Sequence, residues 1–303
     1  MHTQFVRGLI IAMLTLVVSH AVAFADPRED ANTAYDRGDY ATSLKLLNPL
    51  AAQGDPYAQS FLGVMYENGR GVPRDYDEAV RWYRLAAAQG DAHAQYNLGV
   101  MYENGKGVPK DYDEAIKWYR LAVAQGDADA QYNLGAMYAN GQGVPTDGKE
   151  AFKWFRLAAE QGNANAQYSL GVMYQRGWGA PKDYAEAIKM YRLAAEQGNA
   201  DAQYNIGWMY EHGQGVPKDD NEAFKWFRLA AEQGNVTAQY NVGVMYAIGR
   251  GVPNDNVLSY MWLSVAKINL ADVPSKMTAA EVTQAQKMAK RCEESNYKQC
   301  GEP

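Results

Sequence analysis

The chain has 303 residues, of which 47% are hydrophobic and 21% are charged, a composition typical of a folded protein. Its formal net charge is −6, which becomes −7 (−6 minus the +1 of Arg7) if the first 25 residues are removed. An acidic chain without a basic stripe disfavours nucleic acid and anionic lipid surfaces as partners.

Residues 1–25 have the pattern of a secretory signal peptide. Arg7 supplies the positive charge, residues 9–18 form an apolar run, and Ala23-Phe24-Ala25 is a small-residue cleavage site. We expect cleavage after Ala25 and a periplasmic or secreted mature protein with no membrane span. The alternative is an uncleaved anchor, but Ser19 and His20 interrupt a stretch that is already short for a span.

Residues 26–53 resemble a degenerate copy of a 36-residue repeat that begins at Gly54. Two short helices are expected around Arg37-Gly38-Asp39, and Pro49 should kink or shorten the second helix. Because solenoids need altered end repeats, we predict that this segment is an N-terminal cap.

From Gly54 onward the sequence repeats every 36 residues without insertion or deletion. A fixed period of this size indicates a solenoid built from one supersecondary unit. The six predicted units are 54–89, 90–125, 126–161, 162–197, 198–233 and 234–269.

The second unit shows how each one should fold. Asp91 is a good N-cap for a helix that Gly105 ends, and Pro109 prevents that helix from continuing. Asp111 opens the second helix, and Glu114 completes a capping-box pattern. Each unit is therefore a pair of helices joined by a stereotyped turn.

A glycine interrupts the first helix of every unit, as Gly99 does in the second. Glycine costs roughly 1 kcal/mol relative to alanine in a helix. Its return in all six units (Gly63, Gly99, Gly135, Gly171, Gly207 and Gly243) predicts a close approach of two helices at this point.

These units resemble the Sel-1-like repeat, a relative of the tetratricopeptide repeat. In the second unit the matching residues are Ala94, Leu98-Gly99, Tyr102, Gly105-x-Gly107-Val108, Asp111, Ala115, Trp118, Ala122 and the closing Gly126. The resemblance implies an all-α fold, a right-handed α-solenoid. It also implies a non-enzymatic scaffold without cofactor that binds a protein or extended peptide of the cell envelope on its concave face.

By analogy with tetratricopeptide arrays, one stripe of the first helices should line the concave groove. In the second unit it includes Glu103 and Asn104, and across units it gives a tyrosine column of Tyr96, Tyr132, Tyr168, Tyr204 and Tyr240. Trp208, Arg176, His212 and Trp178 depart from the repeat pattern on this side, and an aromatic-plus-arginine cluster is typical of binding hot spots. Two interpretations of the tyrosines remain open, groove surface and packing between repeats. The departures also have a plainer explanation, which is drift at tolerant surface positions.

The C-terminal part, residues 270–303, should close the array. Thr278 to Ser295 has the pattern of an amphipathic helix, which we expect to fold back over the unusually apolar run 257–263. The alternative is that this apolar end mediates dimerisation of an otherwise monomeric protein. Cys292 and Cys300 should form a disulfide in an oxidising compartment, the alternative being a redox-active or metal-binding pair.

Signatures of catalysis, phosphate binding and metal binding are missing from the sequence. The Gly-x-Gly turns belong to neither a P-loop nor a dinucleotide fingerprint, and only His93 and His212 follow the leader. One secreted, cysteine-rich branch of the resembled family is associated with β-lactam binding or hydrolysis, but it carries a disulfide in each repeat and this chain does not. A groove that binds a glycan, such as peptidoglycan or an exopolysaccharide, is the main alternative to a protein scaffold, and an envelope hydrolase is a third hypothesis.

Overall fold

The computed structural model describes residues 26–267, 277–298 and 300, and in these ranges it contains fifteen helices and no strand. The predicted signal peptide lies outside the described residues. The helices are α1 (Pro27–Asp36), α2 (Tyr40–Ala52), α3 (Pro56–Asn68), α4 (Tyr76–Ala88), α5 (Ala92–Asn104), α6 (Tyr112–Ala124), α7 (Ala128–Asn140), α8 (Gly148–Glu160), α9 (Ala164–Arg176), α10 (Tyr184–Glu196), α11 (Ala200–His212), α12 (Asp220–Ala231), α13 (Val236–Ile248), α14 (Asn256–Val265) and α15 (Ala279–Glu294).

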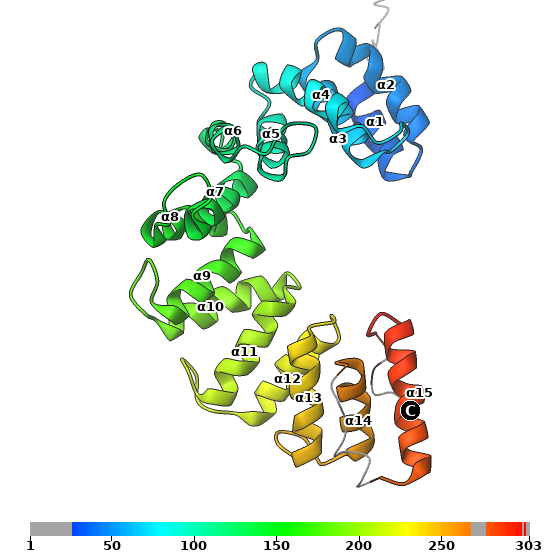
Figure 1. Cartoon of the computed structure of the whole chain (residues 1–303), viewed down its shortest axis with the longest axis vertical. Helices are drawn as coiled ribbons and strands as arrows, with labels where there is room; N and C mark the ends of the chain where they lie inside the picture. The colour runs from blue at the N-terminus through cyan, green and yellow to red at the C-terminus, as the bar shows by residue number, and fades with distance from the viewer. Residues whose placement is uncertain (1–25, 268–276, 299, 301–303) are drawn as a thin grey trace, which may run out of the picture.

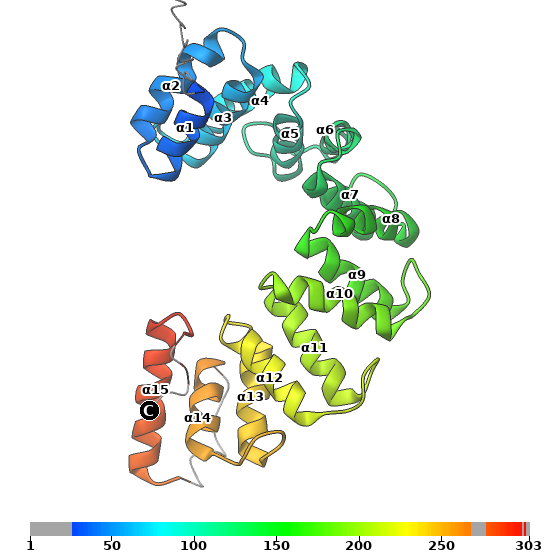
Figure 2. The same ribbon diagram turned by 180° about the vertical axis from the view of Figure 1, so that it is seen from behind.

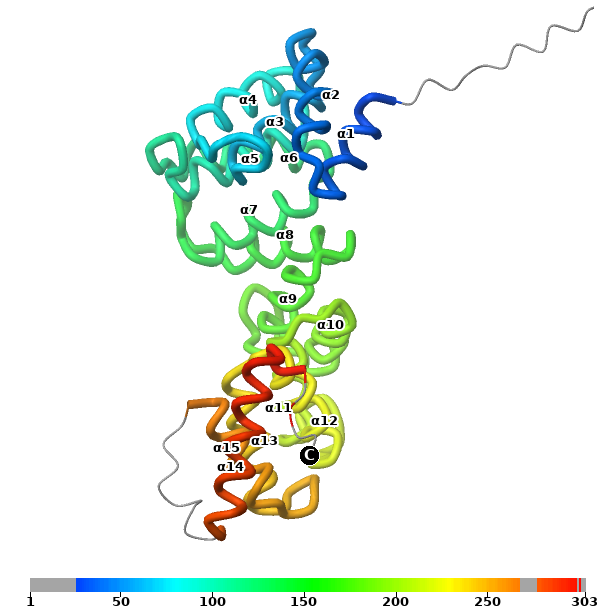
Figure 3. The backbone as a smooth tube through the Cα atoms, turned by 90° about the vertical axis from the view of Figure 1, so that its right-hand side faces the viewer, coloured from blue at the N-terminus to red at the C-terminus, as the bar shows by residue number. Residues whose placement is uncertain are grey.

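The helices stack in chain order into a curved α-solenoid. Figures 1 and 2 show an arc with α1 and α15 at its two ends, and Figure 3 shows the same stack from the side, turned by 90° about its vertical long axis. In Figure 1, α5 and α7 lie on the inner side of the arc relative to α6 and α8. The α-solenoid architecture predicted from the repeats is confirmed.

Caps and glycines set the helix ends of each unit. The Asp91 carboxylate accepts from the backbone N–H of Ala94, and Gly105 ends α5 in the left-handed conformation with φ of 68°. In α6 the Asp111 carboxylate accepts from the N–H of Glu114, as expected of an N-cap. These local signals were readable in the sequence because each depends on a few neighbouring residues.

Two local predictions were wrong. The reciprocal half of the capping box is absent in α6, because the Asp111 N–H already donates to the Tyr102 carbonyl at 2.9 Å and Glu114 pairs with Lys117. Pro49 does not shorten α2, which runs 13 residues to Ala52. Proline is tolerated there because it lies in the last turn, where the helix loses only one terminal hydrogen bond.

The in-helix glycines make room for a ring from the second helix of the same unit. A Cβ on Gly99 would lie 2.4 Å from Cε1 of Tyr119, a fully buried side chain. The same glycine faces Tyr83, Phe155, Tyr191 and Phe227 in other units, and Leu263 in the last. The close approach is therefore between the glycine and a large side chain, which sets the spacing within each pair.

Buried glutamines tie neighbouring units together. Gln95 donates to the Ala87 carbonyl of the preceding unit at 3.3 Å and accepts from Gln125 at 2.8 Å. The first-helix and C-cap glutamines of four other units pair in the same way, as Gln59 does with Gln89 and Gln203 with Gln233. The glutamine pairs lie within one unit, whereas the bond from the first-helix glutamine to the carbonyl eight residues earlier crosses to the preceding unit. Because a buried amide without partners is costly, this second bond favours one register of stacking.

The turns also contact the preceding unit. Gly107 has a φ of 65°, and a Cβ there would lie 2.3 Å from the Tyr76 carbonyl oxygen at the start of α4. Only glycine allows the turn backbone to approach another backbone so closely.

At the C-terminal end α15 packs beside α14 (Figure 1). Met261 and Trp262 of α14 are buried in a cluster that also contains Ala285, Met288 and Cys292 of α15. A true capping box of Thr278 and Glu281 opens α15. Cys292 and Cys300 are joined by a disulfide.

Candidate functional site

A pocket of about 440 Å³ lies between the third and fourth units. It is formed mainly by α7 and α9, with Phe155 from α8 and Asn205 from α11. It brings together four of the predicted groove residues: Tyr132, Tyr168, Arg176 and Trp178.

Small residues in the third unit produce this hollow. Ala136 stands where the neighbouring units have Val100 and Val172, and Ala139 stands where they have Glu103 and Gln175. All of Val172, Ala136 and Ala139 line the pocket. The two alanines were not among the predicted site residues, because an alanine in a helix attracts no notice as a departure from the repeat, whereas a hollow forms where larger side chains are missing.

A third change accompanies the two alanines. In the second unit the hydroxyl of buried Tyr119 donates to Glu103 at 2.5 Å, and in the fourth the hydroxyl of Tyr191 donates to Gln175 at 2.7 Å. In the third unit the corresponding pair is Phe155 and Ala139, so both the donor and the acceptor are absent. The loss of one partner alone would leave a buried polar group unsatisfied, and the paired change avoids that cost.

The pocket combines aromatic walls with one cation. Tyr132 packs against Phe155 with ring centroids 5.6 Å apart, and Tyr168 packs against Tyr191 at 5.9 Å. Burial, and next the charge of Asp201, raise the pKa of Tyr168, so its hydroxyl keeps its proton at neutral pH. Arg176 is exposed and makes no hydrogen bond or ion pair with any described residue.

Trp178 forms the rim of the pocket at the turn between α9 and α10. Its ring is 38% exposed and lies against Gly148, where a Cβ would be 2.8 Å from the indole. Gly148 stands at a position where the first, second and fourth units have a tyrosine (Tyr76, Tyr112 and Tyr184). The absence of a side chain at Gly148 therefore leaves the space that the Trp178 indole occupies.

The other tyrosines of the predicted column lie outside this pocket. Tyr96 and Tyr204 are half-buried and pack on Tyr119 and Phe227 of their own units at 6.0 and 5.5 Å. Tyr240 is exposed, and the second-helix residue of its unit is Leu263 instead of an aromatic. The rings thus serve packing within a unit while part of each remains accessible.

The remaining predicted residues do not join the pocket either. Trp208 stacks on His212 with centroids 4.2 Å apart, one unit further along, so the predicted aromatic-plus-arginine cluster is divided in two. Glu103 is engaged by the Tyr119 hydroxyl, and the Asn104 amide donates to the Val100 carbonyl of its own helix.

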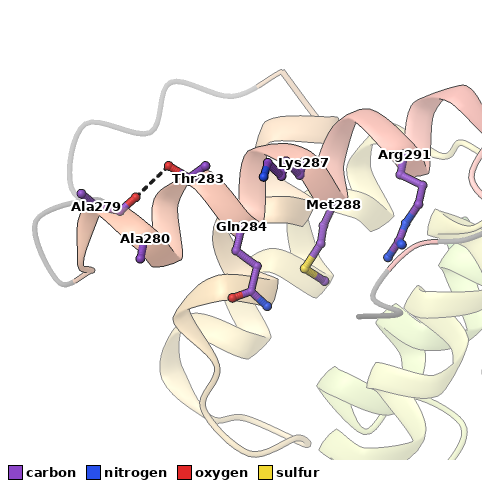
Figure 4. Close-up of a pocket in the computed structure, with 7 residues that line it drawn as sticks. All are labelled: Ala279, Ala280, Thr283, Gln284, Lys287, Met288 and Arg291. Carbon is purple, nitrogen blue, oxygen red and sulfur yellow. Dashed lines mark hydrogen bonds between the residues drawn. The ribbon is translucent and has the colours of Figure 1, made fainter.

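A larger hollow, of about 730 Å³, has a different character. Figure 4 shows that all its lining residues belong to α15, from Ala279 to Arg291, with Gln284, Met288 and Arg291 projecting to one side. One helix face does not enclose a ligand, so we do not treat it as the site. Within the described ranges, no three His, Cys, Asp or Glu side chains gather in a way that could hold a metal ion, and no helix has the length and apolarity needed to cross a bilayer.

Comparisons with known proteins agree with this architecture. A profile of the Sel1 repeat matches six consecutive segments, 56–91, 92–127, 128–163, 164–199, 200–235 and 236–267. Each segment begins two residues later than the unit defined from the sequence, and the last one ends two residues earlier. The crystal structure of a Sel1 repeat protein from Oxalobacter formigenes is 35% identical, with a TM-score of 0.72, over 82% of this chain and 99% of that one. A protective antigen of uropathogenic Escherichia coli with an SLR fold is 26% identical, with a TM-score of 0.51, over 89% of this chain and 85% of that one. Among curated proteins, none matches the chain.

Proposed function

Because the chain belongs to the Sel1 repeat family, whose members are typically non-catalytic scaffolds for protein–protein interaction, we propose that it binds an extended peptide segment of a partner protein in the pocket between α7 and α9. The observation that carries the proposal is the hollow made by Ala136 and Ala139 beside Arg176, an exposed cation without a partner.

The chemistry of the pocket defines the segment it would accept. Arg176 offers a planar set of donors suited to a carboxylate. Trp178 and the tyrosines offer rigid aromatic surface, which contributes binding area at low entropic cost. A segment with an acidic side chain next to an apolar or aromatic one fits both features.

We further propose that the protein acts in the cell envelope after export. The signal-peptide pattern of residues 1–25 supports this, and so does the disulfide between Cys292 and Cys300, since disulfides persist in oxidising compartments. Cell fractionation and intact-mass measurement test it: the exported chain should begin at Asp26. A full-length chain in the cytoplasm would contradict the proposal.

The binding site can be tested by photo-crosslinking in cells that produce the protein. A photoreactive phenylalanine at Trp178 should capture a partner, to be identified by mass spectrometry. The same residue at Lys106, the equivalent turn position of the second unit, is the matched control.

A variant that fills the pocket gives the decisive comparison. Ala136→Val, Ala139→Glu and Phe155→Tyr together convert the third unit to the residues of the second, where Tyr119 and Glu103 already form a stable pair. Capture at Trp178 should disappear in this variant, and Arg176→Glu should weaken it at least tenfold. If the filled variant captures the same partner at the same yield, the pocket is not the binding site.

A further inference from the structure

The second helices carry a column of tryptophans that is broken once. Trp82, Trp118, Trp154, Trp226 and Trp262 recur at 36-residue spacing, and Met190 takes the position in the fourth unit. Each indole packs against the core cluster that precedes it, as Trp118 does against the cluster of α4 and α5 and Trp226 against that of α10 and α11. The position of Met190 is therefore built to hold an indole.

A pocket of about 470 Å³ is present at this position. It lies between α8, α9 and α10, on the side of the second helices, and Met190 forms part of its wall. Ala159 lines it and is half-buried, whereas the equivalent Ala87 and Ala195, in the clusters covered by Trp118 and Trp226, are only 4% and 6% exposed. Methionine thus leaves open the surface that the indole covers elsewhere.

The walls of this pocket match those around Trp118. Leu170, Tyr174 and Leu193 occupy the positions of Leu98, Tyr102 and Leu121 in the second unit. The site differs from an occupied tryptophan site chiefly by the missing ring.

A hydrogen-bond acceptor is also in place. The indole N–H of Trp154 donates to Glu150, one turn earlier on α8, at 3.1 Å. Glu186 holds the equivalent position on α10 and lines the pocket. The indole nitrogens of Trp82 and Trp118 are buried without a hydrogen-bond partner. Burial of the ring is therefore the main requirement for a tryptophan side chain at such a site, and a hydrogen bond to Glu186 adds to its binding.

We propose that this pocket binds the indole ring of a tryptophan side chain presented by a partner polypeptide, which completes the broken column from outside. The site shares α9 with the pocket between α7 and α9 but has no lining residue in common with it, and it does not depend on the function proposed for that pocket.

The test uses the full mature chain and N-acetyl-5-fluoro-L-tryptophanamide, observed by ¹⁹F NMR. We expect broadening of the probe signal with a dissociation constant on the order of 1 mM, as befits a single small ring. Met190→Trp supplies the ring from within and should weaken binding at least tenfold. Circular dichroism checks that this variant is folded.

A gain-of-site variant provides the converse. Trp118→Met opens a pocket with the same walls in the second unit and should raise the stoichiometry from one probe to two. Equal broadening by the wild type and by Met190→Trp, or none at millimolar probe, would overturn the proposal. Binding of free 5-fluoroindole without binding of the capped tryptophan would refute a polypeptide as the source of the ring.

Discussion

Substitution of Gly99 by alanine tests the packing rule that defines each unit. Alanine is the better helix former by roughly 1 kcal/mol, so propensity alone predicts that Gly99→Ala stabilises the protein. The structure predicts the opposite, because the new Cβ would lie 2.4 Å from Cε1 of Tyr119.

The Tyr119 ring cannot simply move aside. It is fully buried, and its hydroxyl donates to Glu103 at 2.5 Å and accepts from Asn133 at 3.1 Å. Overpacking of a core costs about 1–3 kcal/mol, and an anchored ring places this site at the upper end or beyond. After the gain in helix propensity of roughly 1 kcal/mol, we expect a net loss of about 2 kcal/mol or more.

A double-mutant cycle isolates the clash. Tyr119→Ala alone should cost about 3–5 kcal/mol, and in that background Gly99→Ala should become neutral or stabilising by up to about 1 kcal/mol. Urea unfolding followed by circular dichroism gives the overall effect, and hydrogen exchange in α5 and α6 locates it, since a repeat array can open in parts. If Gly99→Ala stabilises the protein equally in both backgrounds, the ring contact does not explain the glycine.

Two further predictions concern the C-terminal end and alkaline pH. Replacing Cys292 and Cys300 by serine removes a loop constraint worth about 2.5 kcal/mol in the chain-entropy account. Hydrogen exchange should therefore accelerate in α15. Equal acceleration in α3 to α6 would contradict a local role of the disulfide. Burial, and next the hydrogen bond to Glu103, raise the pKa of Tyr119 far above its usual value, so the folded chain keeps a proton that the unfolded chain loses near pH 10. That stabilising contribution is complete below about pH 10 and falls above it by about 1.4 kcal/mol per pH unit. Urea unfolding at pH 9, 10 and 11 should therefore show a shallower decline for Tyr119→Phe than for the wild type, and equal slopes would refute the assignment.

The fold was predictable because its determinants are local and repeated. Asp91, Gly105 and Pro109 mark helix ends through interactions within a few residues, and six copies remove the ambiguity of any single one. The error at Glu114 concerns a backbone N–H whose hydrogen-bond partner depends on the surrounding structure, whereas the error at Pro49 came from its place in the last turn of α2, where a proline costs the helix little. In the first case the Asp111 N–H is taken by the Tyr102 carbonyl of the helix before it.

The candidate site was only partly predictable. The sequence pointed to Tyr132, Tyr168, Arg176 and Trp178, which line one pocket, but it grouped them with Trp208 and His212, which lie elsewhere. Adjacency across units depends on how the units stack, and no pattern within one unit specifies that. Both hollows arise from residues smaller or slimmer than their counterparts, at Ala136, Ala139 and Met190. The aligned units show these substitutions, but whether each leaves a cavity depends on how the units stack.

The contact of each turn with the preceding unit has a mechanical consequence. At Gly107, Gly179, Gly215 and Gly251 the atom nearest to an added Cβ is a backbone carbonyl oxygen of the preceding unit, so backbone meets backbone with no flexible side chain between them. The angle between successive units is therefore set by these close backbone contacts. A small change in that angle at one contact produces a large displacement at the ends of the solenoid, because all the units beyond the contact are displaced with it. A substitution at Gly179, in the middle of the array, where an added Cβ would lie 2.0 Å from the Gly148 carbonyl oxygen, would swing α1 and α15 relative to each other while leaving both ends internally unchanged. Small-angle X-ray scattering would detect such a swing as a change in the longest dimension of the molecule, and a partner that contacts both halves of the arc would detect it as lost affinity.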